Sequence, residues 1–128
     1  MSGSKRTIGV TIAVVDDDEA ILDAMRLVLE GQNWDIQTYT TGEEFLADMS
    51  NHKPECVVLD PHLPGLSGAE VARSVAQANA GIPIIGLTAQ PGSPLAVEVV
   101  GAGAWAMLTK PVTSEELVDY IRAAVGRH

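Results

Sequence analysis

Short apolar segments alternate along the chain with longer segments whose apolar residues recur at helical spacing. The short segments are rich in β-branched residues and lie at 11–15, 35–39, 56–59, 82–87 and 104–108. The first, third and fourth are almost continuously apolar, as expected for strands buried on both faces of a parallel sheet. The pattern therefore predicts five strands separated by helices.

Two of the helices are predicted from apolar side chains that share one face of a helix. The residues on these faces are Ile21, Leu22, Met25, Val28 and Leu29 in the first helix and Leu117, Val118, Ile121 and Val125 in the last.

Helix ends are predicted from capping residues. A Ser or Thr followed three residues later by Glu is typical of a capping box. Such pairs are Thr41 with Glu44, Ser67 with Glu70, and Thr113 with Glu116. We expect Asp18 to cap the first helix, Gly31 to end it, and Pro94 to open the fourth.

The order of elements is strand then helix, repeated five times. Such alternation predicts a parallel sheet with helices on both faces, and right-handed crossovers restrict its topology. The leading choice is an α/β fold: a flavodoxin-like, doubly wound, five-stranded parallel sheet in the order 2-1-3-4-5, with five helices in a three-layer arrangement.

Length and composition favour a single domain that does not itself contact nucleic acid. The chain has 128 residues and a net charge of −9, which argues against direct contact with DNA or RNA. Residues 1–9 are expected to form a flexible N-terminal tail before a domain at 10–128. No apolar run approaches the roughly 20 residues of a membrane span. The one cysteine, Cys56, cannot form an internal disulfide, and we expect it to be buried in a strand of a cytoplasmic protein.

Chemically active side chains follow four of the five predicted strands. Ligands of an open α/β sheet bind at the carboxyl ends of its strands. The residues found there are Asp16, Asp17 and Asp18 after the first strand, Asp60 after the third, Thr88 after the fourth and Lys110 after the fifth. These acids, a hydroxyl and an ammonium are therefore expected to meet at one edge.

The meeting of several carboxylates predicts a cation. Two unit charges about 4 Å apart repel by about 4 kcal/mol at an effective dielectric constant of about 20. Lys110 offsets only part of this repulsion. Mg²⁺ suits oxygen ligands and is commonly held by one or two carboxylates plus a phosphate. The sequence thus predicts a Mg²⁺ site that receives a phosphoryl group, with Thr88 and Lys110 contacting its oxygens.

Four short runs resemble the receiver domain of bacterial two-component response regulators. They are Val-Val-Asp-Asp-Asp at 14–18, Leu-Asp-Pro-His-Leu-Pro-Gly-Leu-Ser-Gly at 59–68, Leu-Thr-Ala at 87–89 and Thr-Lys-Pro at 109–111. The resemblance extends over roughly residues 10 to 125, and its strength comes from all four runs occurring in the right order.

The resemblance implies a role for each site residue. Asp60 is the phosphoacceptor, which takes a phosphoryl group from a phosphohistidine. Metal ligands are Asp16, Asp17, Asp60 and the backbone carbonyl of His62. Lys110 pairs with the phosphoryl group, and its bond to Pro111 is expected to be cis. Thr88 moves toward the phosphoryl group and acts as the switch.

The sequence also departs from the family pattern. Met107 stands three residues before Lys110, where the family usually has an aromatic switch residue, so the conformational readout is expected to be altered. His62 and Gln90 occupy positions that tune dephosphorylation in the family. Trp105 either marks a partner interface or folds against the chain's own helices, and both interpretations stay open.

The resemblance implies partners rather than an independent enzyme activity. The domain would catalyse only its own phosphorylation and dephosphorylation. Expected partners are a sensor histidine kinase or phosphotransfer protein, an output domain or effector protein, and a second copy in a homodimer. The alternatives are a receiver-like interaction module that is never phosphorylated, and a Mg²⁺-dependent phosphohydrolase that uses Asp60 as a transient nucleophile.

Overall fold

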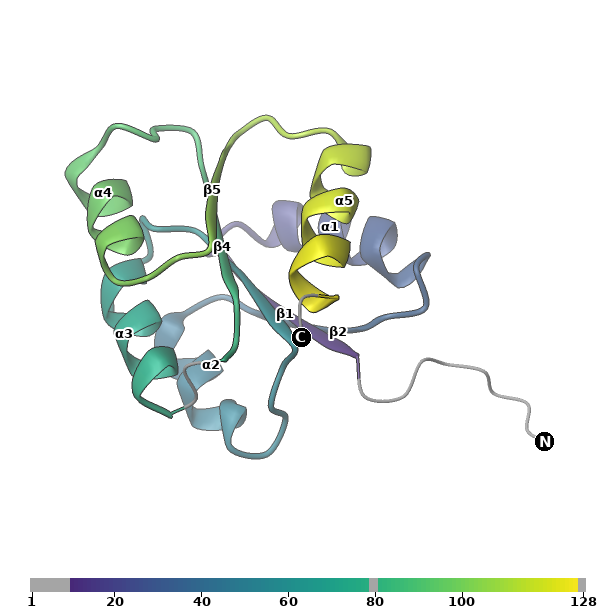
Figure 1. The fold of residues 1–128 in the computed structure, drawn as a ribbon, viewed down its shortest axis with the longest axis horizontal. Helices are drawn as coiled ribbons and strands as arrows, with labels where there is room; N and C mark the ends of the chain where they lie inside the picture. Colours follow the sequence, from purple (N-terminus) through teal and green to yellow (C-terminus); the bar gives the residue numbers. More distant parts are fainter. Residues whose placement is uncertain (1–9, 79–80, 127–128) are drawn as a thin grey trace.

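A computed structural model describes residues 10–78 and 81–126 of the chain; the predicted tail at 1–9 lies outside this part. Five strands and five helices alternate (Figure 1). They are β1 (Thr11–Val15), α1 (Glu19–Glu30), β2 (Asp35–Tyr39), α2 (Gly42–Met49), β3 (Cys56–Leu59), α3 (Gly68–Ala78), β4 (Ile84–Thr88), α4 (Pro94–Gly101), β5 (Ala106–Thr109) and α5 (Ser114–Val125).

The strands form one parallel sheet in the order β2-β1-β3-β4-β5, which confirms the predicted topology. Helices α1 and α5 cover one face, and α2, α3 and α4 cover the other (Figure 1). No helix in the described part of the chain is long and apolar enough to cross a bilayer.

Three strands have the predicted limits, whereas β4 and β5 begin two residues later and end one residue later than predicted. The Pro83 carbonyl accepts from the Val57 N–H at 3.0 Å. Because proline has no N–H to donate, the strand does not extend backward through this residue. The Trp105 N–H donates to the Ile84 carbonyl at 2.7 Å, so the chain reaches β4 just before β5 begins. Differences of this size are common at element ends.

The helix caps follow the predictions with one change, at α2, and Gly31 ends α1 as predicted. Asp18 caps α1, and the capping boxes of Ser67 with Glu70 and Thr113 with Glu116 are reciprocal. At α2, Thr41 accepts from the Glu44 N–H, but the Glu44 carboxylate accepts from the Thr40 N–H. Gly31 ends α1 in an ordinary right-handed conformation, and the left-handed residue is Asn33, with φ of 66°.

Two apolar clusters fill the space between the sheet and its helices. One lies under α1 and α5 and includes Ile12, Val58 and Ile121; the other lies under α2 and α3 and includes Phe45, Val57 and Val71. Among the described residues, the buried polar or charged side chains are Asp16 and Thr88. Burying such groups is costly unless they have partners, which directs attention to their surroundings.

Candidate functional site

The predicted catalytic and metal-binding residues lie at the carboxyl ends of β1, β3, β4 and β5. This is the edge of the sheet where the β4–α4 and β5–α5 connections leave (Figure 1). The register pairs Val15 with Leu59, so the residues that follow them, Asp16 and Asp60, leave the sheet side by side. The Asp60 N–H donates to the Val15 carbonyl at 3.0 Å. Further along the edge, the Lys110 N–H donates to the Thr88 carbonyl at 2.8 Å. Backbone hydrogen bonds thus fix the starting points of all four side chains.

Three carboxylates gather at this edge, as predicted. Asp16, Asp17 and Asp60 each contribute an oxygen, and these atoms lie within 4.8 Å of one another. Asp16 is 3% exposed, whereas Asp17 is exposed and Asp60 lies between the two extremes. The cluster therefore reaches from the interior to the surface.

One ammonium group is shared between two of these carboxylates. The Nζ atom of Lys110 lies 3.1 Å from Asp16 Oδ2 and 3.2 Å from Asp60 Oδ2. Burial raises the pKa of Asp16, and the Asp18 N–H and Lys110 lower it by less. Burial lowers the pKa of Lys110, but Asp16 and Asp60 outweigh this and leave it raised. The raised pKa values of Asp16 and Lys110 are both expected where carboxylates are buried and outnumber the ammonium group.

The oxygen atoms of the cluster fit a small hard cation. Asp16 Oδ1 accepts from the Asp18 N–H at 2.9 Å, and Asp60 Oδ1 accepts from the His62 N–H at 2.8 Å. These bonds orient the two carboxylates, and Asp17 adds an exposed third. An all-oxygen donor set with excess negative charge suits Mg²⁺ or Ca²⁺ better than a thiophilic metal. The arrangement could therefore hold a divalent cation beside Asp60.

The imidazole of His62 connects two loops of the site, a contact that the sequence did not reveal. Its Nδ1 atom lies 3.3 Å from Thr88 Oγ1 and 3.6 Å from Asp60 Oδ1. Its Nε2 atom lies 2.9 Å from Ser93 Oγ. Thr88 Oγ1 also accepts from the N–H of the exposed Gln90 at 3.0 Å. From the sequence, Ser93 was only the residue before Pro94; no sequence signal indicates a contact across 31 positions.

Met107 lies across Gly86 of the neighbouring strand. The register pairs these two residues, and a Cβ built on Gly86 would lie 2.5 Å from Met107 Cε and 2.6 Å from Sδ. The thioether therefore fills the space that a side chain at position 86 would occupy. A glycine inside a buried strand often marks such a close approach, and this was the missed signal.

Trp105 is half-buried and packs against the cluster under α1 and α5. Its ring meets Tyr120 of α5 edge to face, with centroids 6.3 Å apart and an angle of 77°. This contact favours the interpretation in which Trp105 folds against the chain's own helix, and a role at an interface stays a prediction. The Lys110–Pro111 bond is cis, as expected.

Known proteins with the same features are response regulators. The family model of the response regulator receiver domain matches residues 12–122. The response regulator TodT of Pseudomonas putida is 33% identical over 114 residues, which are 89% of this chain and 50% of TodT. The DNA-binding response regulator MtrA of Mycobacterium tuberculosis is 34% identical over 122 residues, or 95% of this chain and 53% of MtrA.

A solved receiver domain has the same architecture. The CheY-like receiver domain protein from Methanospirillum hungatei superposes with a TM-score of 0.85 at 29% identity, covering 91% of this chain and 93% of that one. The present chain spans about half the length of the curated relatives it matches. With the family model, the sheet order and the acidic edge in agreement, the chain belongs to the receiver domain family of two-component response regulators.

Proposed function

We propose that Asp60 accepts a phosphoryl group while Mg²⁺ is held by Asp16, Asp17, Asp60 and the backbone carbonyl of His62. The proposal rests mainly on one observation: three carboxylate oxygens lie within 4.8 Å of one another, at the edge of the sheet where Lys110 and Thr88 also lie. A partly buried site with more carboxylates than cationic groups is stabilised by added positive charge. Mg²⁺ would supply that charge, and the phosphoryl oxygens would supply further ligands to Mg²⁺.

The chemistry assigned to the chain is a displacement at phosphorus. A carboxylate oxygen of Asp60 forms a bond to the phosphorus of a phosphohistidine, the phosphorus–nitrogen bond breaks, and the leaving imidazole takes up a proton from water. Bound Mg²⁺ supplies positive charge to the phosphoryl oxygens.

The chain's own residues orient and neutralise the reacting groups. Lys110 already contacts Asp60 Oδ2 and is placed to pair with a phosphoryl oxygen. The Thr88 hydroxyl, buried at the same edge, donates a hydrogen bond to another. Because Met107 occupies the place of the usual aromatic residue, the signal passes mainly through Thr88 and the β4–α4 loop.

Membership of the family supports a proposal about the physiological setting. We propose a cytoplasmic receiver that is phosphorylated by a sensor histidine kinase or phosphotransfer protein. It then acts on an output domain, an effector or a second copy of itself, through a surface that includes Trp105. The relatives TodT and MtrA are about twice as long as the matched segment, and MtrA is named as DNA-binding, which supports an attached or separate output partner.

The test is phosphorylation by a small donor. The protein is incubated with acetyl phosphate and Mg²⁺, and intact mass is measured over time. We expect one phosphoryl group per chain, lost when Mg²⁺ is omitted and lost in Asp60→Asn. Asp23→Asn is the matched control, since Asp23 is an exposed aspartate on α1.

Other outcomes separate the alternatives. A wild-type chain that never gains a phosphoryl group would favour an interaction module without phosphorylation. Rapid release of phosphate from simple phosphate esters, with no lasting adduct, would favour a phosphohydrolase. An adduct that persists in Asp60→Asn would assign the acceptor to another residue.

A further inference from the structure

We propose that Ser93 is a positioning residue that controls the lifetime of the phosphoryl group on Asp60 by holding the imidazole of His62. The proposal rests on the acceptor role proposed for Asp60. It assigns a task in the phosphoryl chemistry to the residue that caps α4, on a different loop from the acceptor.

The His62 ring is held from both sides. Its side chain is 32% exposed, and that of Asp60 is 12% exposed. On one side Nε2 lies 2.9 Å from Ser93 Oγ. On the other side Nδ1 lies 3.3 Å from Thr88 Oγ1 and 3.6 Å from Asp60 Oδ1. Rotating the ring away from Asp60 would break the contact with Ser93.

Ser93 is itself fixed by its position at the end of a helix. It is the N-cap of α4, and its Oγ accepts from the Ala96 N–H at 3.2 Å. A serine hydroxyl has one proton to donate, and Nε2 of His62 lies 2.9 Å away. Because Oγ already accepts from Ala96, we assign the hydroxyl proton to a hydrogen bond with Nε2.

This hydrogen bond selects one tautomer of the ring. If Nε2 accepts from Ser93, neutral imidazole carries its proton on Nδ1. Nδ1 faces Thr88 Oγ1 at 3.3 Å and a carboxylate oxygen of Asp60 at 3.6 Å, and beside a carboxylate an N–H is favourable and a lone pair is not. Ser93 thus presents an N–H donor to the acceptor and its future phosphoryl oxygens.

A ring held in this place slows hydrolysis. In hydrolysis a water oxygen bonds to phosphorus, the phosphorus–oxygen bond to Asp60 breaks, the carboxylate is regenerated, and phosphate leaves with both hydrogens of the water. The fixed imidazole occupies space beside the acceptor that the water would otherwise enter. We expect its release to accelerate hydrolysis about fivefold, the rate change that corresponds to the net value of one hydrogen bond.

The experiment is a double-mutant cycle on phosphoryl lifetime. Each protein is phosphorylated with acetyl phosphate and Mg²⁺, the donor is removed, and loss of the adduct is followed by intact mass. We expect Ser93→Ala and His62→Ala each to decay about five times faster than wild type. The double variant should decay no faster than His62→Ala, and Ser93→Thr, which keeps the hydroxyl, should decay like wild type.

A control separates positioning from loss of the helix cap. Val97→Gly weakens α4 at an exposed position, 58% exposed, and leaves the hydroxyl of Ser93 and the imidazole of His62 in the chain. It should leave the lifetime unchanged. The proposal is overturned if Val97→Gly accelerates decay as much as Ser93→Ala, if the effects of Ser93→Ala and His62→Ala multiply independently, or if Ser93→Ala decays like wild type.

A second measurement does not depend on phosphorylation. Long-range ¹H–¹⁵N spectra of the unphosphorylated protein at mildly alkaline pH report which ring nitrogen carries the proton. We expect the Nδ1–H form for His62 in wild type and in Ser93→Thr, and a shift toward the Nε2–H form in Ser93→Ala. An Nε2–H form in wild type would refute the positioning role even if Asp60 is phosphorylated as proposed.

Discussion

Gly68 and Gly86 leave equally little room for a side chain, but their neighbours differ. A Cβ at Gly68 would lie 2.6 Å from Pro61 Cα and 3.1 Å from the Asp60 carbonyl oxygen, which are backbone atoms of the acceptor loop. A Cβ at Gly86 would meet only the end of the Met107 side chain at such a distance. A thioether can move with little cost, whereas the loop cannot move without displacing Asp60.

This difference predicts unequal costs for the same substitution. Overpacking costs about 1–3 kcal/mol, and replacing glycine by alanine inside a helix returns about 0.5–1 kcal/mol. We expect Gly68→Ala to lower the free energy of unfolding and to slow phosphorylation, and Gly86→Ala to cost less and leave phosphorylation intact. Urea unfolding measures the first quantity. Gly101→Ala is the control, because a Cβ added there would meet no other part of the structure within 4 Å. Equal losses in the Gly68 and Gly86 variants would contradict the argument.

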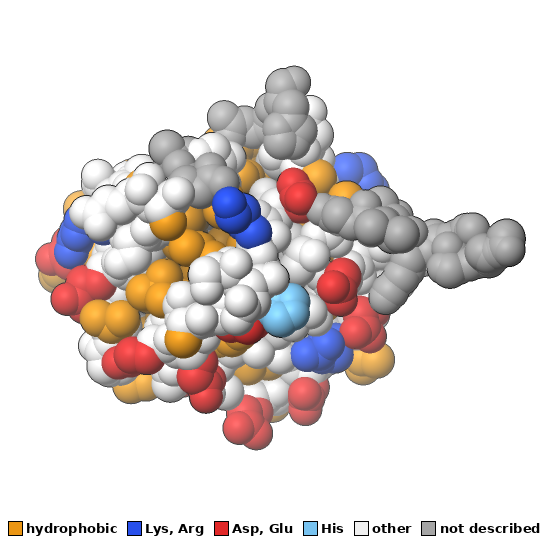
Figure 2. All heavy atoms as spheres, turned by 90° about the horizontal axis from the view of Figure 1, so that it is seen from below, with side chains coloured by type: hydrophobic (Ala, Val, Ile, Leu, Met, Phe, Trp, Pro, Cys, Tyr) orange, Lys and Arg blue, Asp and Glu red, His pale blue; other side chains and the backbone are white. Residues whose placement is uncertain are grey.

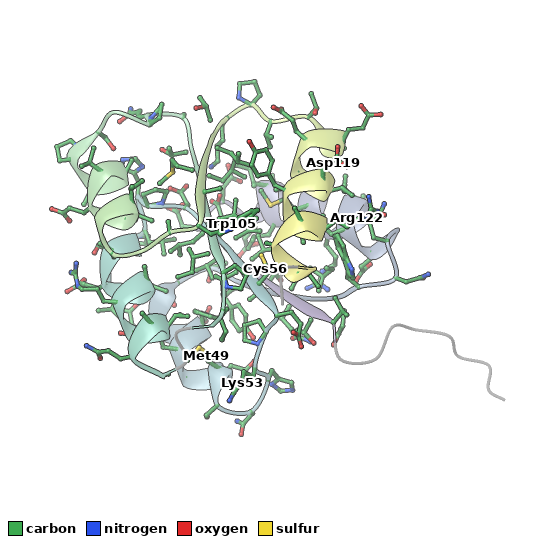
Figure 3. All side chains as sticks on the ribbon, viewed as in Figure 1. Met49, Lys53, Cys56, Trp105, Asp119 and Arg122 are labelled. Atoms are coloured by element: carbon green, nitrogen blue, oxygen red, sulfur yellow. The ribbon has the colours of Figure 1, made fainter. Side chains whose placement is uncertain are left out.

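Cys56 is expected to be unreactive in the folded protein. The side chain is buried in β3 (Figure 3), and burial raises its pKa to about 12. The thiolate is the reactive form, so at pH 8 almost none is present. Iodoacetamide should label the chain only in denaturant, as seen by intact mass. Fast labelling of the native protein at pH 8 would show that the strand opens readily.

The capping box at the start of α5 predicts a measurable loss of stability. Thr113 accepts from the Glu116 N–H at 3.0 Å, and Glu116 accepts from the Thr113 N–H at 3.3 Å. Removing the hydroxyl in Thr113→Ala should cost about 1 kcal/mol. Ser114→Ala, one residue further along at an exposed position, should cost much less. The two are compared by thermal unfolding, and similar midpoints would mean that the box contributes nothing.

At the scale of elements, the sequence predicted order and type better than limits and caps. The limits of β3 were right because charged residues, Glu55 and Asp60, flank its apolar run on both sides. Those of β4 were wrong because Ile82 and Pro83 are apolar yet lie outside the ladder. The Glu44 carboxylate accepts from Thr40 and not from the predicted Thr41 N–H. Thr40 donates both its N–H and its hydroxyl to it.

For the molecule as a whole, negative charge favours the binding of cations. The net charge is −9, and acidic side chains are spread over the surface opposite the site as well (Figure 2). Added cations therefore have both a diffuse effect, which salt screens, and a local effect at the three carboxylates. Only the local effect distinguishes Mg²⁺ from a monovalent salt.

Magnesium should stabilise the fold through Asp17. A ligand that binds only the folded chain adds about 2.7 kcal/mol at one hundred times its dissociation constant. We expect Mg²⁺ at constant ionic strength to raise the unfolding temperature of wild type and of Asp23→Asn, and to have little effect on Asp17→Asn. Without Mg²⁺, Asp17→Asn should be at least as stable as wild type, because one repelling charge is gone. An unchanged Mg²⁺ response in Asp17→Asn would remove this residue from the site.

The sequence predicted which residues meet at the site, but not every contact among them. Asp16, Asp60, Thr88 and Lys110 were predictable because parallel strands bring their carboxyl ends to one edge. The contact of His62 with Ser93 was not, because it depends on the side-chain direction of one loop and the cap of a helix on another. The pairing of Met107 with Gly86 required the register of β4 and β5, which the hydrophobic pattern alone does not determine.

Because the Met107 side chain packs directly on Gly86, the side chains allowed at these two positions depend on each other. An aromatic ring introduced at position 107 would pack on the backbone of Gly86. A side chain introduced at position 86 would displace the side chain at position 107. Homologues that restore an aromatic residue at the first position should therefore carry a compensating exchange at the second, so that the pair is inherited together or not at all.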